Sequence, residues 1–152
     1  MQFLLMRKDE RVMQLLLPIL TKVTNSSGET SLMLAAATNN VAYINMLLEA
    51  GSDINSIDSM GRTALMFAVK HNLDDVLKLL IDKGADLFVA SKEGDTVVSL
   101  ALQYKSGACL RSLISNMTVP MMVEMVEKES EYVLRDLVEK IYQYKGYKEL
   151  VM

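Results

Sequence analysis

Few residues in this chain have side chains of the types that catalysis needs. The 152 residues include one histidine, His71, and one cysteine, Cys109. A nucleophilic cysteine needs a base beside it, but His71 falls at the end of one expected helix and Cys109 within another. We therefore expect no Cys–His pair. With no second cysteine for an internal disulfide, Cys109 is expected to be a small buried side chain.

Metal and phosphate sites are also missing from the sequence. The chain has no set of His and Cys residues spaced to hold zinc, and neither a G-x-x-x-x-G-K-S/T loop nor a G-x-G-x-x-G turn. Its carboxylates Asp53, Asp58 and Asp86 stand at expected turns, where they would accept hydrogen bonds from nearby backbone amides. We therefore expect no enzymatic activity, no cofactor and no small-molecule substrate.

The glycines mark a repeat, and this repeat defines the elements of the fold. Three glycines fall 33 residues apart, and a threonine follows each of them two positions later. The pairs are Gly28 with Thr30, Gly61 with Thr63, and Gly94 with Thr96. A fixed period of this length predicts stacked supersecondary units, none of which buries its apolar face alone. Each threonine is expected to cap a helix, because its hydroxyl can accept a hydrogen bond from an unpaired backbone N–H.

Each unit is expected to contain two helices. Apolar residues recur at the three- and four-residue spacing of a helical face. They are Leu32, Ala35, Ala36, Leu65, Ala68 and Val69 in the first helices, and Ile44, Leu47, Leu48, Leu77, Leu80 and Ile81 in the second helices. Asn39, Asn40 and Asn72 fall in the turn between the helices, where asparagine tolerates a positive φ. Gly51 and Gly84 are expected to end the second helices as C-terminal caps.

These segments resemble the ankyrin repeat, whose pattern runs roughly G-x-T-P-L-H-L-A-A, a helix–helix turn, V-V-x-L-L-L and G-A-D-V-N. Residues 28–36 read G-E-T-S-L-M-L-A-A, and residues 61–69 read G-R-T-A-L-M-F-A-V. The resemblance implies an all-α ankyrin-repeat solenoid of stacked helix-turn-helix units with short hairpin-like fingers. It further implies a non-enzymatic protein–protein interaction module that acts as an adaptor or scaffold.

The sequence departs from the family pattern at two positions of the first helix. The proline after the threonine is replaced by Ser31, Ala64 and Val97, and the histidine by Met33, Met66 and Ser99. Because that histidine commonly joins neighbouring repeats, we expect polar cross-links along the stack to be missing. The chain contains 12 methionines, and a flexible thioether fills irregular gaps well. Methionine packing is therefore expected to replace the missing cross-links.

We expect a single domain over residues 1–152. Its expected parts are a degenerate N-terminal unit (1–27), two repeats (28–60 and 61–93), a divergent repeat (94–117) and C-terminal capping helices (118–152). In the first part, Phe3-Leu4-Leu5 would be the stub of a first helix and residues 12–17 would belong to a second helix. Such a start in mid-unit fits either a natural cap or a piece of a longer array.

The C-terminal part is expected to form two helices. Thr118 and Pro120 are typical of a helix start, and Ser130 is expected to cap a longer helix. The apolar stripe of that longer helix would consist of Val133, Leu134, Leu137, Val138 and Ile141. The alternative is that Tyr142, Tyr144 and Tyr147 belong to a partner-binding tail.

Composition and charge argue against several classes of main partner. The formal net charge of −3 and a pI near 5.2 disfavour nucleic acid and anionic membranes. The apolar run at residues 1–6 is too short for a secretory signal. No stretch reaches the roughly 20 apolar residues that span a bilayer. We expect a soluble protein of the cytoplasm or nucleus.

The resemblance also implies a contact surface, because ankyrin partners usually lie across the finger tips and the concave side of the first helices. The matching positions in this chain are Glu29, Thr38, Ile57, Ser59, Met60, Arg62, Lys70, His71, Lys92, Glu93, Asp95, Gln103 and Tyr104. We expect a monomer that binds one protein partner there. The alternatives are a fragment or self-associating segment of a larger scaffold, and a host-directed effector from a virus or an intracellular bacterium.

Overall fold

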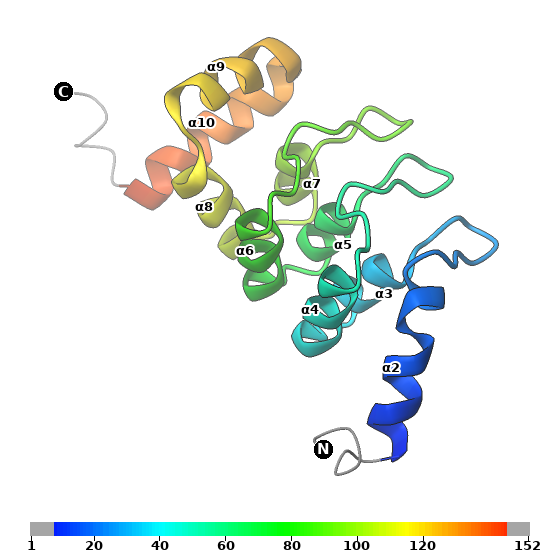
Figure 1. The fold of residues 1–152 in the computed structure, drawn as a ribbon. Helices are drawn as coiled ribbons and strands as arrows, with labels where there is room; N and C mark the ends of the chain where they lie inside the picture. The colour runs from blue at the N-terminus through cyan, green and yellow to red at the C-terminus, as the bar shows by residue number, and fades with distance from the viewer. Residues whose placement is uncertain (1–7, 146–152) are drawn as a thin grey trace.

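The computed structural model describes residues 8–145 and is helical throughout that range, apart from the loops (Figure 1). The helices are α2 (Lys8–Leu20), α3 (Ser31–Ala37), α4 (Val41–Glu49), α5 (Ala64–Lys70), α6 (Asp74–Asp82), α7 (Val97–Gln103), α8 (Gly107–Asn116), α9 (Val119–Lys128) and α10 (Glu131–Lys145). Within the described residues no β-strand forms, and one isolated antiparallel bridge joins Thr24 to Thr30. No helix in this range is long and apolar enough to cross a membrane.

The helices form two rows, and three loops project from the same side of the stack (Figure 1). In the inner row α3 contacts α5, α5 contacts α7, and α7 contacts α10. The outer row consists of α4, α6 and α8, each packed against the first helix of its own unit. One core of buried Leu, Ala, Val, Ile and Met side chains runs through both rows. The predicted all-α solenoid is therefore confirmed.

Threonines begin the inner helices as expected. Thr30 Oγ1 accepts a hydrogen bond from the backbone N–H of Met33 at 3.2 Å. Thr63 Oγ1 accepts from Met66 N at 3.4 Å, and Thr96 Oγ1 accepts from Ser99 N at 3.2 Å. Each bond satisfies one of the four backbone donors that a helix N-terminus leaves unpaired. The three caps fix where the first helix of each unit starts.

The helix–helix turns use asparagine in two units. Asn39 has φ 59° and Asn72 has φ 54°, so the predicted left-handed conformation is confirmed at both. The prediction is wrong for Asn40, which has φ −94° and caps α4 by accepting from Tyr43 N at 3.1 Å. In the third unit the left-handed position is occupied by Lys105, with φ 55°.

Hydrogen bonds join neighbouring units, so the expectation that polar cross-links are missing is wrong. Ser106 Oγ donates to the Val69 carbonyl at 2.5 Å, and Asn72 Oδ1 accepts from Cys109 N at 3.4 Å. Ser112 Oγ also donates to Asp74 Oδ1. These donors and acceptors lie at the turns and on the outer helices, away from the first-helix position where the family has its histidine.

Three residues expected to have structural roles are buried. Met33 and Met66 have almost no exposed surface, so the prediction that methionine packs the interior is confirmed for both. Cys109 is fully buried, and burial, with a smaller contribution from Asp74, raises the pKa of its thiol to about 12. A thiol with so high a pKa is not ionised near neutral pH and is a poor nucleophile.

The first helix of the described stack, α2, differs from its counterpart α6. Leu17 and Leu20 pack against the core, while Val12 and Leu16 are 46% and 42% exposed. Their counterparts in α6, Val76 and Leu80, are 0% exposed. The physical reason is position, because α6 packs against both α5 and α8, whereas α2 packs against α4 at the start of the described stack. The predicted Phe3-Leu4-Leu5 stub lies outside the described residues.

Two helices follow the third unit, with the predicted caps. Thr118 Oγ1 accepts from Met121 N at 3.5 Å, with Pro120 in the first turn of α9. Ser130 Oγ accepts from Val133 N at 3.4 Å. In the expected stripe of α10, Leu137 is buried and Val138 is half exposed, and the side chain of Ile141 lies outside the described part. So do the side chains of Tyr142 and Tyr144, and all of Tyr147.

Helix α10 occupies the place of a fourth first helix. It packs on α7 as α7 packs on α5, and Glu129, 33 residues after Thr96, accepts a hydrogen bond from Thr96 Oγ1. Burial raises the pKa of Glu129, and the Thr96 hydrogen bond opposes that shift in part. Helix α9 therefore stands in the sequence position that a finger occupies in the earlier units.

Candidate partner-binding groove

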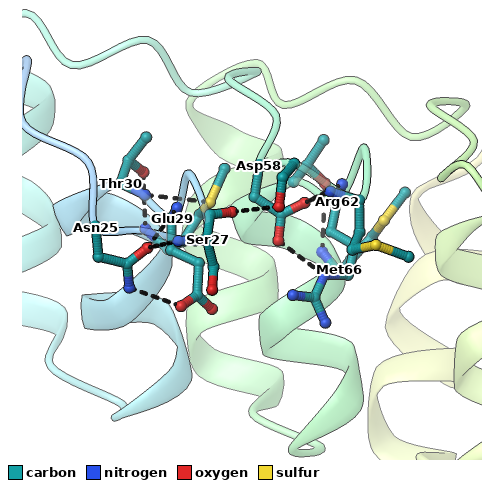
Figure 2. A network of polar contacts seen from close by, with 11 residues as sticks. Asn25, Ser27, Glu29, Thr30, Asp58, Arg62 and Met66 are labelled. Carbon is teal, nitrogen blue, oxygen red and sulfur yellow. Dashed lines mark hydrogen bonds and ion pairs between the residues drawn. The ribbon is translucent and has the colours of Figure 1, made fainter.

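The three fingers are built on the same five-residue turn, which recurs every 33 residues. In each turn the first residue donates its N–H to the fifth residue's carbonyl, and its side chain accepts the fifth residue's N–H. The three turns are Asn25–Glu29 (3.1 and 2.9 Å), Asp58–Arg62 (3.0 and 2.8 Å) and Ser91–Asp95 (2.8 and 3.1 Å). Figure 2 shows the first two of these turns side by side. This repeated geometry places Glu29, Arg62 and Asp95 at equivalent points of the concave side.

Backbone hydrogen bonds hold the fingers in a row. Ser59 donates to the Ser27 carbonyl through both its N–H (3.0 Å) and its hydroxyl (2.7 Å). One repeat later, Lys92 N–H donates to the Met60 carbonyl at 2.8 Å. The hydroxyl of Ser59, a residue we expected to contact a partner, thus has a structural role.

The second finger holds a buried carboxylate. The side chain of Asp58 is 0% exposed; its Oδ1 accepts from Met60 N at 3.0 Å and its Oδ2 from Arg62 Nε at 2.8 Å. The guanidinium of Arg62 lies over the Phe67 ring, 5.1 Å from its centroid. A charge-assisted bond and a cation–π contact together fix this side chain before any partner arrives. The expectation that Asp58 bonds backbone amides at a turn is confirmed.

Two shallow hollows adjoin each other between the second and third units. Their volumes are about 70 and 90 Å³, well below the roughly 300 Å³ at which small-molecule pockets begin. They share Arg62, Glu93, Asp95 and Leu100. We call this surface the groove and define it by Met60, Arg62, Phe67, Lys70, Glu93, Asp95, Leu100 and Tyr104. Its size fits individual side chains of a larger partner.

The far end of the groove carries an aromatic residue. Tyr104 lies at the C-terminal cap of α7 and is 45% exposed. The Lys70 ammonium lies 5.9 Å from the centroid of its ring. Tyrosine and arginine are enriched among the residues that dominate binding energy at protein interfaces. The groove therefore has one such residue towards each end, Arg62 beside the finger and Tyr104 at the helix ends.

The groove brings together about half of the predicted contact residues. Met60, Arg62, Lys70, Glu93, Asp95 and Tyr104 all line it. Ile57, His71, Lys92 and Gln103 are exposed but do not line it. In the first unit, Glu29 Oε1 accepts from Asn25 Nδ2 at 2.8 Å, and Thr38 Oγ1 donates to the Leu34 carbonyl at 2.9 Å.

Sequence reasoning missed the apolar floor of the groove. Phe67 and Leu100 line it, yet neither was among the predicted contacts. The repeat carries a signal for them, because Leu34, Phe67 and Leu100 are 33 residues apart and occupy the same face of α3, α5 and α7. No group of three or more His, Cys, Asp or Glu side chains within residues 8–145 is placed to hold a metal ion.

Comparison with protein families agrees with this architecture. A model of ankyrin repeats, three copies long, matches residues 2–91 and 60–122. The chain therefore belongs to the ankyrin repeat family. A search of curated proteins returned no match. Ankyrin repeats are generally protein–protein interaction modules, and the family is typically non-enzymatic.

Proposed function

We propose that this protein is a non-enzymatic adaptor that binds a protein partner through its finger tips and concave helix face, centred on the groove. The observation that carries the proposal is Arg62, which Asp58 and Phe67 hold in place at the edge of a hollow that also presents Tyr104. The proposal treats residues 1–152 as one domain, with residues 118–152 as its C-terminal cap.

Preorganisation makes the groove a better binding surface than the rest of the concave face. Ordering a long side chain on binding costs about 0.5–1.5 kcal/mol. Arg62 is already partly ordered in the free protein, so binding loses less conformational entropy there. Phe67 and Leu100 add buried apolar surface beneath it. In the first finger Asn25 holds Glu29 in a similar way, but neither of these residues lines either hollow.

Affinity capture from a eukaryotic cell lysate tests the proposal. The wild-type protein is used as bait and compared with two double variants. The first is Arg62→Glu, Tyr104→Ala; the second is Lys70→Glu, Tyr104→Ala, which leaves the Asp58–Arg62 pair intact. The matched control is Arg135→Glu, Tyr132→Ala, which makes the same exchanges on the exposed face of α10. Helicity and melting temperature are checked for every bait.

We expect one protein to be retained by the wild type and by the α10 control, and lost from both groove variants. Equal retention by all baits would contradict the proposal, as would loss from the α10 control alone. Either result would move the contact to the outer row or to the C-terminal helices.

One observation favours a second function, self-association or membership of a longer array. Exposed apolar residues of α2 recur at the spacing of a helical face, at Val12, Leu15, Leu16 and Ile19. Apolar patches of this kind often mark interaction sites. Sedimentation velocity at increasing protein concentration tests this function. A monomer whose melting does not depend on concentration would count against it.

A further inference from the structure

The charges of the groove are only partly balanced within the protein. The Arg62 guanidinium is paired with the buried carboxylate of Asp58. Lys70 lies beside the Tyr104 ring at the far end. The carboxylates of Glu93 and Asp95 make no hydrogen bond or ion pair with any group that the structure describes. With Arg62 and Asp58 cancelling, the groove keeps two carboxylates against the single charge of Lys70.

Apolar surface adjoins the two carboxylates. Leu100 lies on the floor of both hollows and Met60 on the wall of one, where Met60 is 38% exposed. Lysine and arginine bury their methylene stems along apolar surface while keeping the charged head beside its partner. A basic side chain matches both features of the groove, the apolar floor and the unpaired carboxylates.

Other side chains fit this place less well. An acidic side chain between Glu93 and Asp95 would be a third carboxylate set against Lys70, the one groove cation that Asp58 does not pair, and like charges side by side at an interface are costly. An apolar side chain would cover the two carboxylates and leave them desolvated, with no partner. The hollows also admit only one side chain each, because their volumes are about 70 and 90 Å³.

We propose that the groove recognises a basic segment of its protein partner, with a lysine or arginine side chain placed between Glu93, Asp95 and Leu100. The proposal rests on the proposed function and adds the chemistry of the partner. The neighbouring partner side chain contacts Phe67 and Tyr104 at the other end of the groove. Association through such charges is faster at low salt and weakens as salt is added.

Selection from a displayed library of random twelve-residue peptides tests the inference on the full-length protein. Peptides that bind the wild type are sequenced and measured again on Glu93→Gln, Asp95→Asn. This variant removes two charges without changing side-chain size and breaks no hydrogen bond made by either carboxylate. The matched control is Glu49→Gln, Asp82→Asn, which neutralises two exposed carboxylates at the ends of α4 and α6.

We expect the selected peptides to be enriched in lysine and arginine over the starting library. Their affinity is expected to fall at least about tenfold on Glu93→Gln, Asp95→Asn, since the variant removes both carboxylates that would accept charge-assisted hydrogen bonds from the basic side chain. The control is expected to bind them as the wild type does. Equal loss in the control would show general attraction to an acidic protein and overturn the inference.

The inference and the proposed function fail differently. One outcome would overturn the inference and leave the groove as the binding site. In that outcome the selected peptides are not enriched in basic residues, fail to bind Lys70→Glu, Tyr104→Ala, and still bind Glu93→Gln, Asp95→Asn. Peptides retained on both variants would contradict the groove itself. A selection that enriches no peptide at all would also count against recognition of a linear basic segment.

Discussion

The first and second fingers form one pair, and the second and third fingers form another. The two pairs have the same backbone hydrogen bond between fingers and differ in their side chains. Ser59 N–H donates to Ser27 O in the first pair, and Lys92 N–H donates to Met60 O in the second. The concave side of the first unit presents Glu29 and Thr38, whose polar groups bond within the unit. The positions equivalent to Glu29 are Arg62 in the second unit and Asp95 in the third. Those equivalent to Thr38 are His71, which follows Lys70, and Tyr104. The groove forms beside these residues.

The comparison separates two kinds of position. Residues that repeat faithfully, the glycines and the capping threonines, build the scaffold. Residues that change from unit to unit, such as Thr38 to Tyr104, build the candidate site. A family with a rigid repeated backbone can therefore change its partner by changing the second kind alone.

The largest effect is expected where two fingers meet. Gly28 has φ +75°, and a Cβ there would lie 2.9 Å from Ser59 N. Gly94 has φ +86° with nothing within 4 Å of such a Cβ. Gly28→Ala should therefore cost about 3 kcal/mol of unfolding free energy and Gly94→Ala about 1 kcal/mol, as measured by urea denaturation. Equal costs would show that the close approach of the fingers does not matter.

Truncating the first residue of the five-residue finger turn should lower the unfolding free energy by different amounts in the first and second fingers. Asp58→Ala is expected to cost about 2 kcal/mol, because it breaks bonds to Met60, Arg62 and the Arg62 guanidinium. Asn25→Ala, at the matching exposed position, should cost about 1 kcal/mol. Only Asp58→Ala should also weaken capture of the partner, since the Arg62 guanidinium then loses the ion pair that fixes its position. Equal weakening by Asn25→Ala would show that the first unit takes part in binding.

Of the capping threonines Thr30, Thr63 and Thr96, only Thr96 bonds a carboxylate within the described range, that of Glu129. Burial raises the pKa of Glu129 above its ordinary value of 4.5. The folded state therefore favours the protonated form, and the stability linked to this group is present below pH 4.5 and lost as pH rises through the raised pKa.

Glu129→Gln should thus be modestly more stable than wild type at pH 7, with the difference shrinking towards pH 4. Melting curves over that range measure it, with the exposed Glu127→Gln as the control. A Gln variant that is less stable at pH 7 would mean that the Thr96 bond to the ionised carboxylate outweighs the cost of burial.

The smallest effect is expected at the turn of the third unit. Lys105 has φ 55°, where the first two units have asparagine. Lys105→Asn should stabilise the fold by about 0.5 kcal/mol, because asparagine tolerates the left-handed region better than most side chains. The control is Lys83→Asn, at a helix end with φ −88°, which should not stabilise the protein. Similar gains in both would point to an effect of charge.

Features that depend on one unit could be predicted from the sequence. The threonine caps, the left-handed Asn39 and Asn72, and the buried apolar positions all follow from local spacing. The hydrogen bonds between units could not be predicted, because they depend on how one unit is positioned on the next. Ser59 and Ser106 show this, since nothing in their local sequence indicates a carbonyl in the preceding repeat as their acceptor.

The candidate site was predictable only in part for the same reason. The resemblance placed Arg62 and Tyr104 on the concave side, but their separation along the chain gives no sign of a shared hollow. Asp58 was predicted to bond its own turn, and its second role of holding Arg62 required the side-chain geometry. The sequence pattern indicates only that Phe67 and Leu100 belong to the core. In the structure they belong to the core and also form the floor of the groove.

Hydrogen exchange of the protein with and without its captured partner tests whether the groove is the binding site. Binding is expected to slow amide exchange in residues 58–71 and 91–104, which form the groove, and to leave residues 25–38 and α10 unchanged. Protection confined to α9 and α10, or to the first unit, would contradict the assignment of the groove as the binding site.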